Sequence, residues 1–360
     1  MRVAVLGRAG RGIVIGLPGA GIRRYDPDVP RIAVIFTGGT IAMRRDPGAG
    51  GNLPTLRGEE LLASVPGLDA IADIEPIDWG LVPASHLSFD QVLEIGRLVA
   101  DALGRPEMDG AVVVQGTDVI EETAFAWDLL PLTPKPVVVV GAMRSASDEG
   151  YDGPENLRNA VIAAADPALA ELGVVVAMAG ELHAADDVRK THSHALDTFQ
   201  SPNAGRMGTV ADGRVALERS RVPTRLPAIP AHAASPVPLI TVVLDDRGAV
   251  EEAVVRGPAG LVVAATGGGN TPEPVLAAAR ELIGRGIPVI LTTRCPTGQP
   301  RPGYAFPGGS SEWWEAGAIF SGTLGGPKSR VLLSLGVGCG LEAGEIAARC
   351  ATWGGGYRGG

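Results

Sequence analysis

Cysteine is scarce in this chain and shows no clustering. The 360 residues include three cysteines, Cys295, Cys339 and Cys350, and none stands in a CxxC motif or close to histidines. An odd number of widely spaced cysteines indicates neither a disulfide framework nor a zinc site. We therefore expect a reducing compartment, the cytoplasm, and no metal.

An excess of positive charge and long apolar runs are also lacking. The formal net charge is −9, and this negative charge repels nucleic-acid phosphates and anionic lipids. We therefore expect the protein to bind a small molecule, and we expect it to bind neither a nucleic acid nor a membrane. No uncharged apolar run reaches the roughly 18 residues of a membrane helix. Arginines interrupt the apolar opening MRVAVLGRAGRGIVIG, so a secretory signal is not expected either.

Aromatic residues make up only 4%, whereas glycine (51) and proline (29) are abundant, which predicts many tight turns. The length of 360 residues exceeds the size at which a single core stops growing, so two domains are expected. Hydrophobic residues amount to 45%, an ordinary value for a globular protein, and this excludes global disorder.

The order of apolar patterns along the chain predicts an α/β fold. From residue 31 onward, short β-branched runs alternate with helical patterns, as in βαβ units on a parallel sheet. We expect an N-terminal extension (1–30), a larger N-terminal catalytic domain with a mainly parallel sheet (31–217), a proline-rich linker (218–238) and a smaller C-terminal α/β domain (239–360).

The expected strands are 32–36, 111–115, 137–140, 174–178, 239–244, 261–265 and 287–292, and the expected helices are 89–103, 121–130, 155–165, 273–283 and 328–335. The glycine-rich tail from Trp353 is expected to fray, because glycine loses the most entropy on ordering.

Two hydroxyls follow the first predicted strand directly, in Thr37-Gly38-Gly39-Thr40. The carboxyl ends of strands are where open α/β sheets bind ligands. The glycines let backbone N–H groups approach a substrate oxygen, and a threonine at the bend can act as a nucleophile. Taken alone, such a turn is more often structural.

A second strand ends in the same way, in Gly116-Thr117-Asp118. Asp118 by itself would be interpreted as a helix cap. Lys190, in Asp187-Val188-Arg189-Lys190-Thr191, would by itself be a solvated surface charge. Placed beside Thr117 and Asp118, however, a desolvated lysine can take a proton from a hydroxyl.

Together these segments resemble the bacterial L-asparaginase/glutaminase family. The blocks TGGTIA, GTD..EETA, GAMR, DGPENL and DVRKT occur in the family's order, and the resemblance covers about residues 31–335. It implies a two-step acyl transfer from asparagine through a threonine, without metal or organic cofactor. It leaves open whether glutamine is also hydrolysed.

The resemblance assigns roles residue by residue. Thr37 matches the usual nucleophile, and Thr117, Asp118 and Lys190 match the second threonine, carboxylate and lysine, with Asp118 holding the substrate's α-amino group. Asn270, in Thr266-Gly267-Gly268-Gly269-Asn270, matches an asparagine that a neighbouring subunit contributes. The family's shared site thus implies at least a homodimer. From its residues alone, Asn270 would be a turn residue.

Four departures from the family's pattern stand out. The loop 44–56 contains no tyrosine where members often carry a catalytic one, and Gln115 replaces a common histidine. The substrate-contacting serine falls at Ala84 or Ser85, and Ser85 is favoured for its hydroxyl. The cross-subunit glutamate aligns near Ala305, so the neighbouring Tyr304 is a candidate proton relay, with a packing role as the alternative.

Other readings stay open at this point. His192 and His194 lack a third ligand signal and are interpreted as solvated or hydrogen-bonded side chains rather than a metal pair. The missing loop tyrosine also fits a low-turnover amino-acid-binding protein on the same fold. A third reading is the amidase subunit of a tRNA-dependent amidotransferase, which usually has a longer N-terminal extension.

Overall fold

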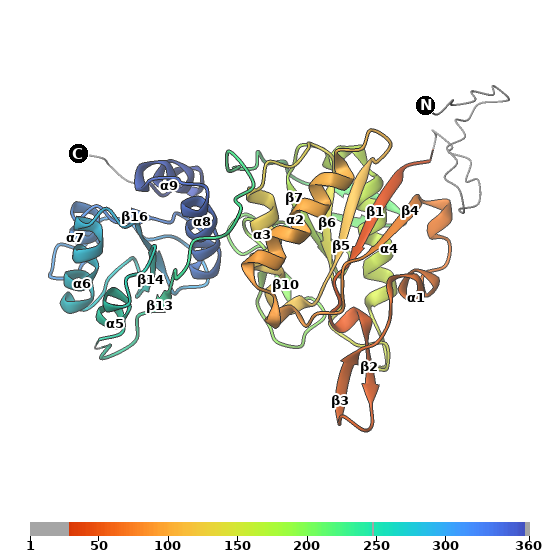
Figure 1. The fold of residues 1–360 in the computed structure, drawn as a ribbon, viewed down its shortest axis with the longest axis horizontal. Coiled ribbons are helices and arrows are strands. Elements are labelled where there is room, and N and C mark those ends of the chain that lie inside the picture. The colour runs from red at the N-terminus through yellow and green to blue at the C-terminus, as the bar shows by residue number, and fades with distance from the viewer. Residues whose placement is uncertain (1–28, 247, 357–360) are drawn as a thin grey trace, which may run out of the picture.

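A computed structural model describes residues 29–246 and 248–356 of the chain. The extension 1–28 lies outside the described residues, and so does Tyr25. Two α/β units stand side by side, one carrying the N-terminal and one the C-terminal part of the chain (Figure 1). None of the helices in these two ranges combines the length and apolar character needed to cross a membrane.

The larger unit is built on one eight-stranded sheet. Its strands are β1 (Arg31–Phe36), β4 (Asp73–Asp78), β5 (Gly110–Val114), β6 (Val137–Val140), β7 (Val174–Met178), β8 (Glu181–Ala184), β11 (Gly208–Ala211) and β12 (Arg214–Leu217). They lie in the order β12-β11-β8-β7-β6-β5-β1-β4. The five strands from β7 to β4 are parallel, and β8, β11 and β12 extend the sheet antiparallel.

Helices cover both faces of this sheet. Helices α2 (Phe89–Leu103) and α3 (Ile120–Leu129) pack together on one face, and α4 (Gly153–Ala165) covers the other (Figure 1). A capping box fixes the start of α2, since Ser88 accepts from the Gln91 amide and Gln91 accepts from the Ser88 amide. The short helix α1 (Gly58–Ala63) precedes β4. Because β1 and β5 are adjacent and parallel, the turns after them meet at one edge.

The smaller unit has four parallel strands, β13 (Leu239–Thr241), β14 (Leu261–Ala265), β15 (Val289–Thr293) and β16 (Ile319–Phe320). Its helices are α5 (Ala249–Val255), α6 (Glu273–Gly284), α7 (Ser310–Glu315), α8 (Gly326–Gly338) and α9 (Ala343–Cys350). Helix α8 contacts α3 of the larger unit. Leu332 and Leu335 of α8 belong to the same apolar cluster as the large sheet, so the two units share a core.

The predicted fold class is confirmed: a larger, mainly parallel sheet domain is followed by a smaller α/β domain. The predicted strands 137–140, 174–178 and 261–265 coincide with β6, β7 and β14. These strands are buried on both faces of their sheets, so a continuous apolar run in the sequence is enough to predict them.

Two local predictions were wrong. Residues 44–56, expected as a loop, contain an antiparallel hairpin of β2 (Met43–Asp46) and β3 (Gly51–Pro54), which has mostly polar side chains and therefore no apolar alternation. The tail was expected to fray from Trp353, but the Trp353 indole donates to Asp186 at 3.1 Å and packs on Phe125. Residues 357–360 lie outside the described residues.

A buried ion cluster ties the segment after β12 to both units. Arg221 donates to both carboxylate oxygens of Asp128 in α3, at 3.1 and 2.6 Å, and lies 3.2 Å from Asp186. Burial opposes the charge of Arg221, but the two carboxylates raise its pKa. Asp128 also accepts from the Val174 amide, so the cluster fixes α3 against β7.

We expect His183 to make the protein sensitive to acid. His183 is buried in β8, its Nδ1 lies 3.0 Å from the Ser201 hydroxyl, and burial lowers its pKa to about 4 although Glu181 and Asp187 oppose this. The unfolded imidazole takes up a proton below its ordinary pKa of about 6.5, whereas the folded one does not. Stability is therefore fully present above pH ~6.5 and is lost progressively as the pH falls from there to the folded pKa, by about 3 kcal/mol in all.

Urea unfolding at pH 7 and pH 4.5 measures this loss. His183→Asn should remove most of the pH dependence, and His194→Asn, at an exposed position, should keep it. An equal acid sensitivity in wild type and His183→Asn would assign the effect to other groups.

Candidate active site

The two hydroxyl-bearing turns touch through glycine backbone. A Cβ at Gly39 would lie 2.1 Å from the Gly116 nitrogen, so no other residue allows this approach. Gly38 and Gly39 also have φ of 107° and 93°, which side chains rarely adopt. The turn after β1 is thereby pressed against the turn after β5.

Thr37 stands at the end of β1 and is held firmly. Its backbone N–H and its hydroxyl both donate to the Val114 carbonyl, at 3.0 and 3.1 Å, and its own carbonyl accepts from Val82. The residue is almost fully buried. Its hydroxyl oxygen therefore has a fixed position beside the last residue of β5.

Thr117, Asp118 and Lys190 are brought together. The Lys190 ammonium donates to the Thr117 hydroxyl at 3.0 Å and to the Asp118 carboxylate at 3.1 Å. Thr117 is buried, whereas the Asp118 side chain is 62% exposed. No side-chain hydrogen bond caps the start of α3 or the 3-10 turn that precedes it. Asp118 is therefore not a helix cap.

Several contacts position Lys190. Its strand, β9 (Arg189–Lys190), pairs with β10 (Phe199–Gln200), and its backbone N–H donates to Glu121 at 3.1 Å. Lys328 of α8, itself buried, donates to the Val188 carbonyl two residues earlier. Burial lowers the pKa of Lys328, and Glu121 opposes this. The smaller domain thus holds the segment that carries Lys190.

Gln115 and Ser85 border this cluster. Gln115 is fully buried, accepts from the Thr123 hydroxyl at 3.0 Å and donates to the Gly116 carbonyl at 3.3 Å, so it braces the turn 115–123. Ala84 packs on Gly116, with 2.9 Å between its Cβ and a Cβ built there, while the neighbouring Ser85 is exposed.

Asn270 and Tyr304 lie in the smaller domain. Asn270 follows β14, and its amide oxygen accepts from the Ser310 amide at 3.2 Å. Tyr304 lies between β15 and α7, is 48% exposed and packs on Phe306, with 5.9 Å between the ring centroids. These contacts of Asn270 and Tyr304 are all with residues of the smaller domain. Within one chain, neither residue contacts Thr37.

Tyr151 is a residue that sequence reasoning missed. Its hydroxyl donates at 2.6 Å to the carbonyl of Ile41, four residues after Thr37. Burial raises the pKa of this phenol to about 12, Asp152 adds to the effect and Arg44 opposes it. In the sequence, the one feature that points to Tyr151 is its place directly before Asp152-Gly153-Pro154. Nothing in the sequence indicates that residue 151 contacts residue 41.

The segment before Tyr151 also holds the hairpin. The Ala146 N–H donates to the Met43 carbonyl and the Arg45 N–H to the Ser147 hydroxyl, both at 3.0 Å. The sequence predicted a loop here, but the structure contains a hairpin whose base is anchored by these two bonds.

No group of three or more histidine, cysteine, aspartate or glutamate side chains in the described ranges could hold a metal ion. His192 instead accepts from the backbone N–H groups of His194 and Ala195, both at 3.0 Å. The three cysteines are free thiols.

Comparisons with known proteins agree with this architecture. Residues 31–223 match the family model "Asparaginase, N-terminal", and residues 237–349 match "Glutaminase/Asparaginase C-terminal domain". L-asparaginase 2 of Escherichia coli is 31% identical, with 90% of this chain and 92% of the relative covered. A probable periplasmic L-asparaginase of Haemophilus influenzae is 32% identical over 86% and 88%.

Two further proteins are similar. A glutaminase-asparaginase of Pseudomonas aeruginosa is 31% identical, with 74% of this chain and 76% of the relative covered. The crystal structure of a probable cytoplasmic L-asparaginase from Campylobacter jejuni superposes with a TM-score of 0.78 at 29% identity, covering 89% of this chain and 99% of that one.

Thr117, Asp118 and Lys190 should act as one unit, because a single ammonium links all three. We expect a Thr117→Ala, Asp118→Asn, Lys190→Met triple variant to be scarcely slower in amide hydrolysis than the worst single variant. Steady-state kcat/KM of the four proteins measures this. Losses that multiply would show that the three residues serve separate steps.

Proposed function

The chain belongs to the asparaginase family, and we propose that it hydrolyses L-asparagine to L-aspartate and ammonia through an acyl-enzyme on Thr37. The observation that carries the proposal is the Lys190 ammonium, which bonds both Thr117 and Asp118 beside the turn that bears Thr37. The name of the Pseudomonas relative suggests glutamine as a second substrate.

The geometry divides the work among these groups. The Thr37 oxygen forms a bond to the amide carbon, its proton passes to the leaving nitrogen, and ammonia departs. Water then attacks the acyl carbon, aspartate leaves and Thr37 regains its proton. Lys190 moves protons through the Thr117 hydroxyl, while the exposed Asp118 carboxylate holds the substrate's α-ammonium.

Backbone and neighbouring side chains complete the pocket. N–H groups of Gly38 and Gly116 face the developing oxyanion, and Ser85 contacts the substrate. No cofactor takes part in this scheme.

A second subunit is part of the proposal. Asn270 and Tyr304 are held within the smaller domain of their own chain, so they serve the site only when they come from a partner. Exposure of both Tyr304 and Phe306, at 48% and 49%, is consistent with a surface that another subunit covers. We therefore propose a homodimer or a dimer of dimers with shared sites, located in the cytoplasm, where the three free thiols stay reduced.

One observation favours a second candidate, an amino-acid-binding protein with little turnover. Residues 44–56 contain no tyrosine, and Tyr151 is committed to the Ile41 carbonyl. Such a protein would bind asparagine and aspartate without releasing ammonia.

Thr37→Ala should lower kcat for asparagine by about 10³-fold or more, because it removes the nucleophile. Coupled detection of ammonia measures the rate. The matched control is Thr55→Ala, the same change at an exposed position. A Thr37→Ala protein with substantial turnover would move the nucleophile to Thr117, and an inactive wild type would favour the binding protein.

Tyr304→Phe should lower kcat by roughly 10²-fold, the scale of a positioned proton donor or acceptor, if its hydroxyl relays the proton of Thr37 across the subunit boundary. Binding of aspartate should barely change, because the ring and its packing on Phe306 remain. Phe306→Leu is a control for the packing alone. A wild-type kcat in Tyr304→Phe would exclude the phenol from the reaction and leave Lys190 as the base.

A further inference from the structure

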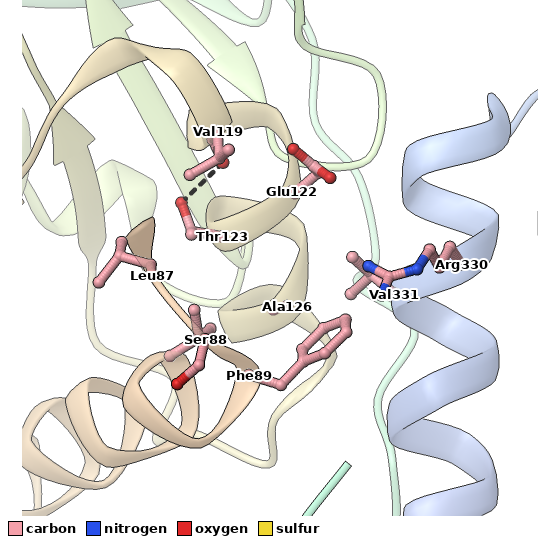
Figure 2. A pocket seen from close by; sticks show the side chains of 10 residues that line it. Leu87, Ser88, Phe89, Val119, Glu122, Thr123, Ala126, Arg330 and Val331 are labelled. Atoms are coloured by element: carbon pink, nitrogen blue, oxygen red, sulfur yellow. Dashed lines mark hydrogen bonds between the residues drawn. The ribbon is translucent and has the colours of Figure 1, made fainter. Parts of the chain in front are cut away.

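A cavity of about 230 Å³ lies where the two domains meet (Figure 2). Its walls come from the start of α2, from α3 with the turn before it, and from α8. The active-site turns are not among its lining: Thr37, Thr117, Asp118 and Lys190 are all absent from the cavity wall. It is therefore a separate cavity, formed only when both domains are in place.

Two opposite charges face this cavity from different domains. Glu122 projects from α3 and Arg330 from α8 (Figure 2). Neither a hydrogen bond nor an ion pair joins them, and in the described residues the Glu122 carboxylate has no hydrogen-bond partner. Burial raises the pKa of Glu122 and Glu121 adds to the effect, against Arg330 and Lys328. Its carboxylate is thus partly desolvated, and it is attracted to Arg330 and Lys328 without a direct ion pair to either.

The guanidinium of Arg330 is held in place through its Nε, whereas its two terminal nitrogens make no hydrogen bond within the described residues. Its Nε donates to the Val237 carbonyl at 2.8 Å, and its centre lies 5.1 Å from the centroid of the Phe89 ring. The two terminal nitrogens offer the planar fork that a carboxylate binds in two places.

The rest of the lining is largely apolar. Leu87, Val92, Ala126 and Val331 supply the aliphatic part of the wall beside the two charges. A volume near 230 Å³ is below the roughly 300–1,000 Å³ of pockets for drug-sized ligands, which favours a small occupant. The occupant must be small, partly apolar and charged at one end.

We propose that this cavity binds a free aliphatic α-amino acid such as leucine, with its ammonium at Glu122 and its carboxylate at Arg330. An anion without an ammonium would pair with Arg330 and leave Glu122 unpaired, and an amine without a carboxylate would do the reverse. A neutral molecule would leave both charges uncompensated. An α-amino acid carries both charges on one carbon, so it complements Glu122 and Arg330 together while its side chain meets the aliphatic wall.

The cavity is connected to the active site by short contacts. Thr123 lines it, and its hydroxyl donates to Gln115 at 3.0 Å and to the Val119 carbonyl at 3.1 Å. Gln115 directly precedes Gly116-Thr117-Asp118. On the opposite wall, α8 carries Lys328, which holds Val188 near Lys190. A ligand that bridges α3 and α8 therefore stabilises both segments of the catalytic cluster, which makes the site regulatory.

Isothermal titration of the whole protein with L-leucine tests the binding directly and needs no turnover, so it is independent of whether Thr37 is the nucleophile. We expect saturable binding. The probes 4-methylpentanoate, which lacks the ammonium, and 3-methylbutylamine, which lacks the carboxylate, should each bind about tenfold or more weakly. Equal binding of either analogue, or no binding of leucine, would overturn the proposal.

Glu122→Gln should weaken leucine binding by about tenfold or more, because it removes the charge but keeps the shape. Glu94→Gln, the same change at an exposed position of α2, is the matched control and should bind like wild type. If the two variants bind leucine equally well, Glu122 is not part of the site. Circular dichroism and the urea midpoint establish that each variant is folded.

Titrations at increasing aspartate concentration distinguish this cavity from the active site. If leucine simply entered the active site, its apparent Kd would rise in proportion to aspartate without limit, and the proposal would fail. A separate, coupled cavity gives a change that levels off, and the affinity for aspartate must change by the same factor when leucine is saturating.

Discussion

Everything at the site depends on the contact between Gly39 and Gly116. Two parallel strands place their carboxyl ends about 5 Å apart, but side chains would normally separate the turns that follow. A Cβ at Gly39 would overlap the Gly116 backbone, so glycine at this position brings the hydroxyl of Thr37 and the Thr117 cluster to a common edge. Gly38 and Gly39 adopt their positive φ values without strain, and the cost of this approach is the larger conformational entropy that glycine loses on folding.

A cluster of buried charged side chains stabilises the larger domain around this contact. Arg221, from the segment between the two sheets, is bound by Asp128 of α3 and by Asp186, which also accepts from Trp353. Each charge is compensated, so removing one partner would leave the other buried and unpaired, a cost of several kcal/mol. The cluster joins four segments that are far apart in the chain.

Sequence reasoning succeeded where one segment carried its own signal. The valine runs of β6 and β7 are buried on both sides, and the hydroxyls after β1 and β5 follow directly from strand ends. It failed where structure depends on distant partners. The hairpin β2–β3 has no apolar alternation, and Tyr151 becomes relevant only through the Ile41 carbonyl. The roles proposed for Asn270 and Tyr304 require a second chain, and the pattern within one chain does not place it.

The position of α8 limits how this protein can be divided. Leu332 and Leu335 lie in the core of the large sheet, and Lys328 of the same helix binds the segment of Lys190. Exchanging the smaller domain for that of a relative would therefore exchange part of the larger domain's own interior. The two halves of the chain have to vary together, and a hybrid needs an α8 that matches its α3, whatever the sequence of the intervening linker.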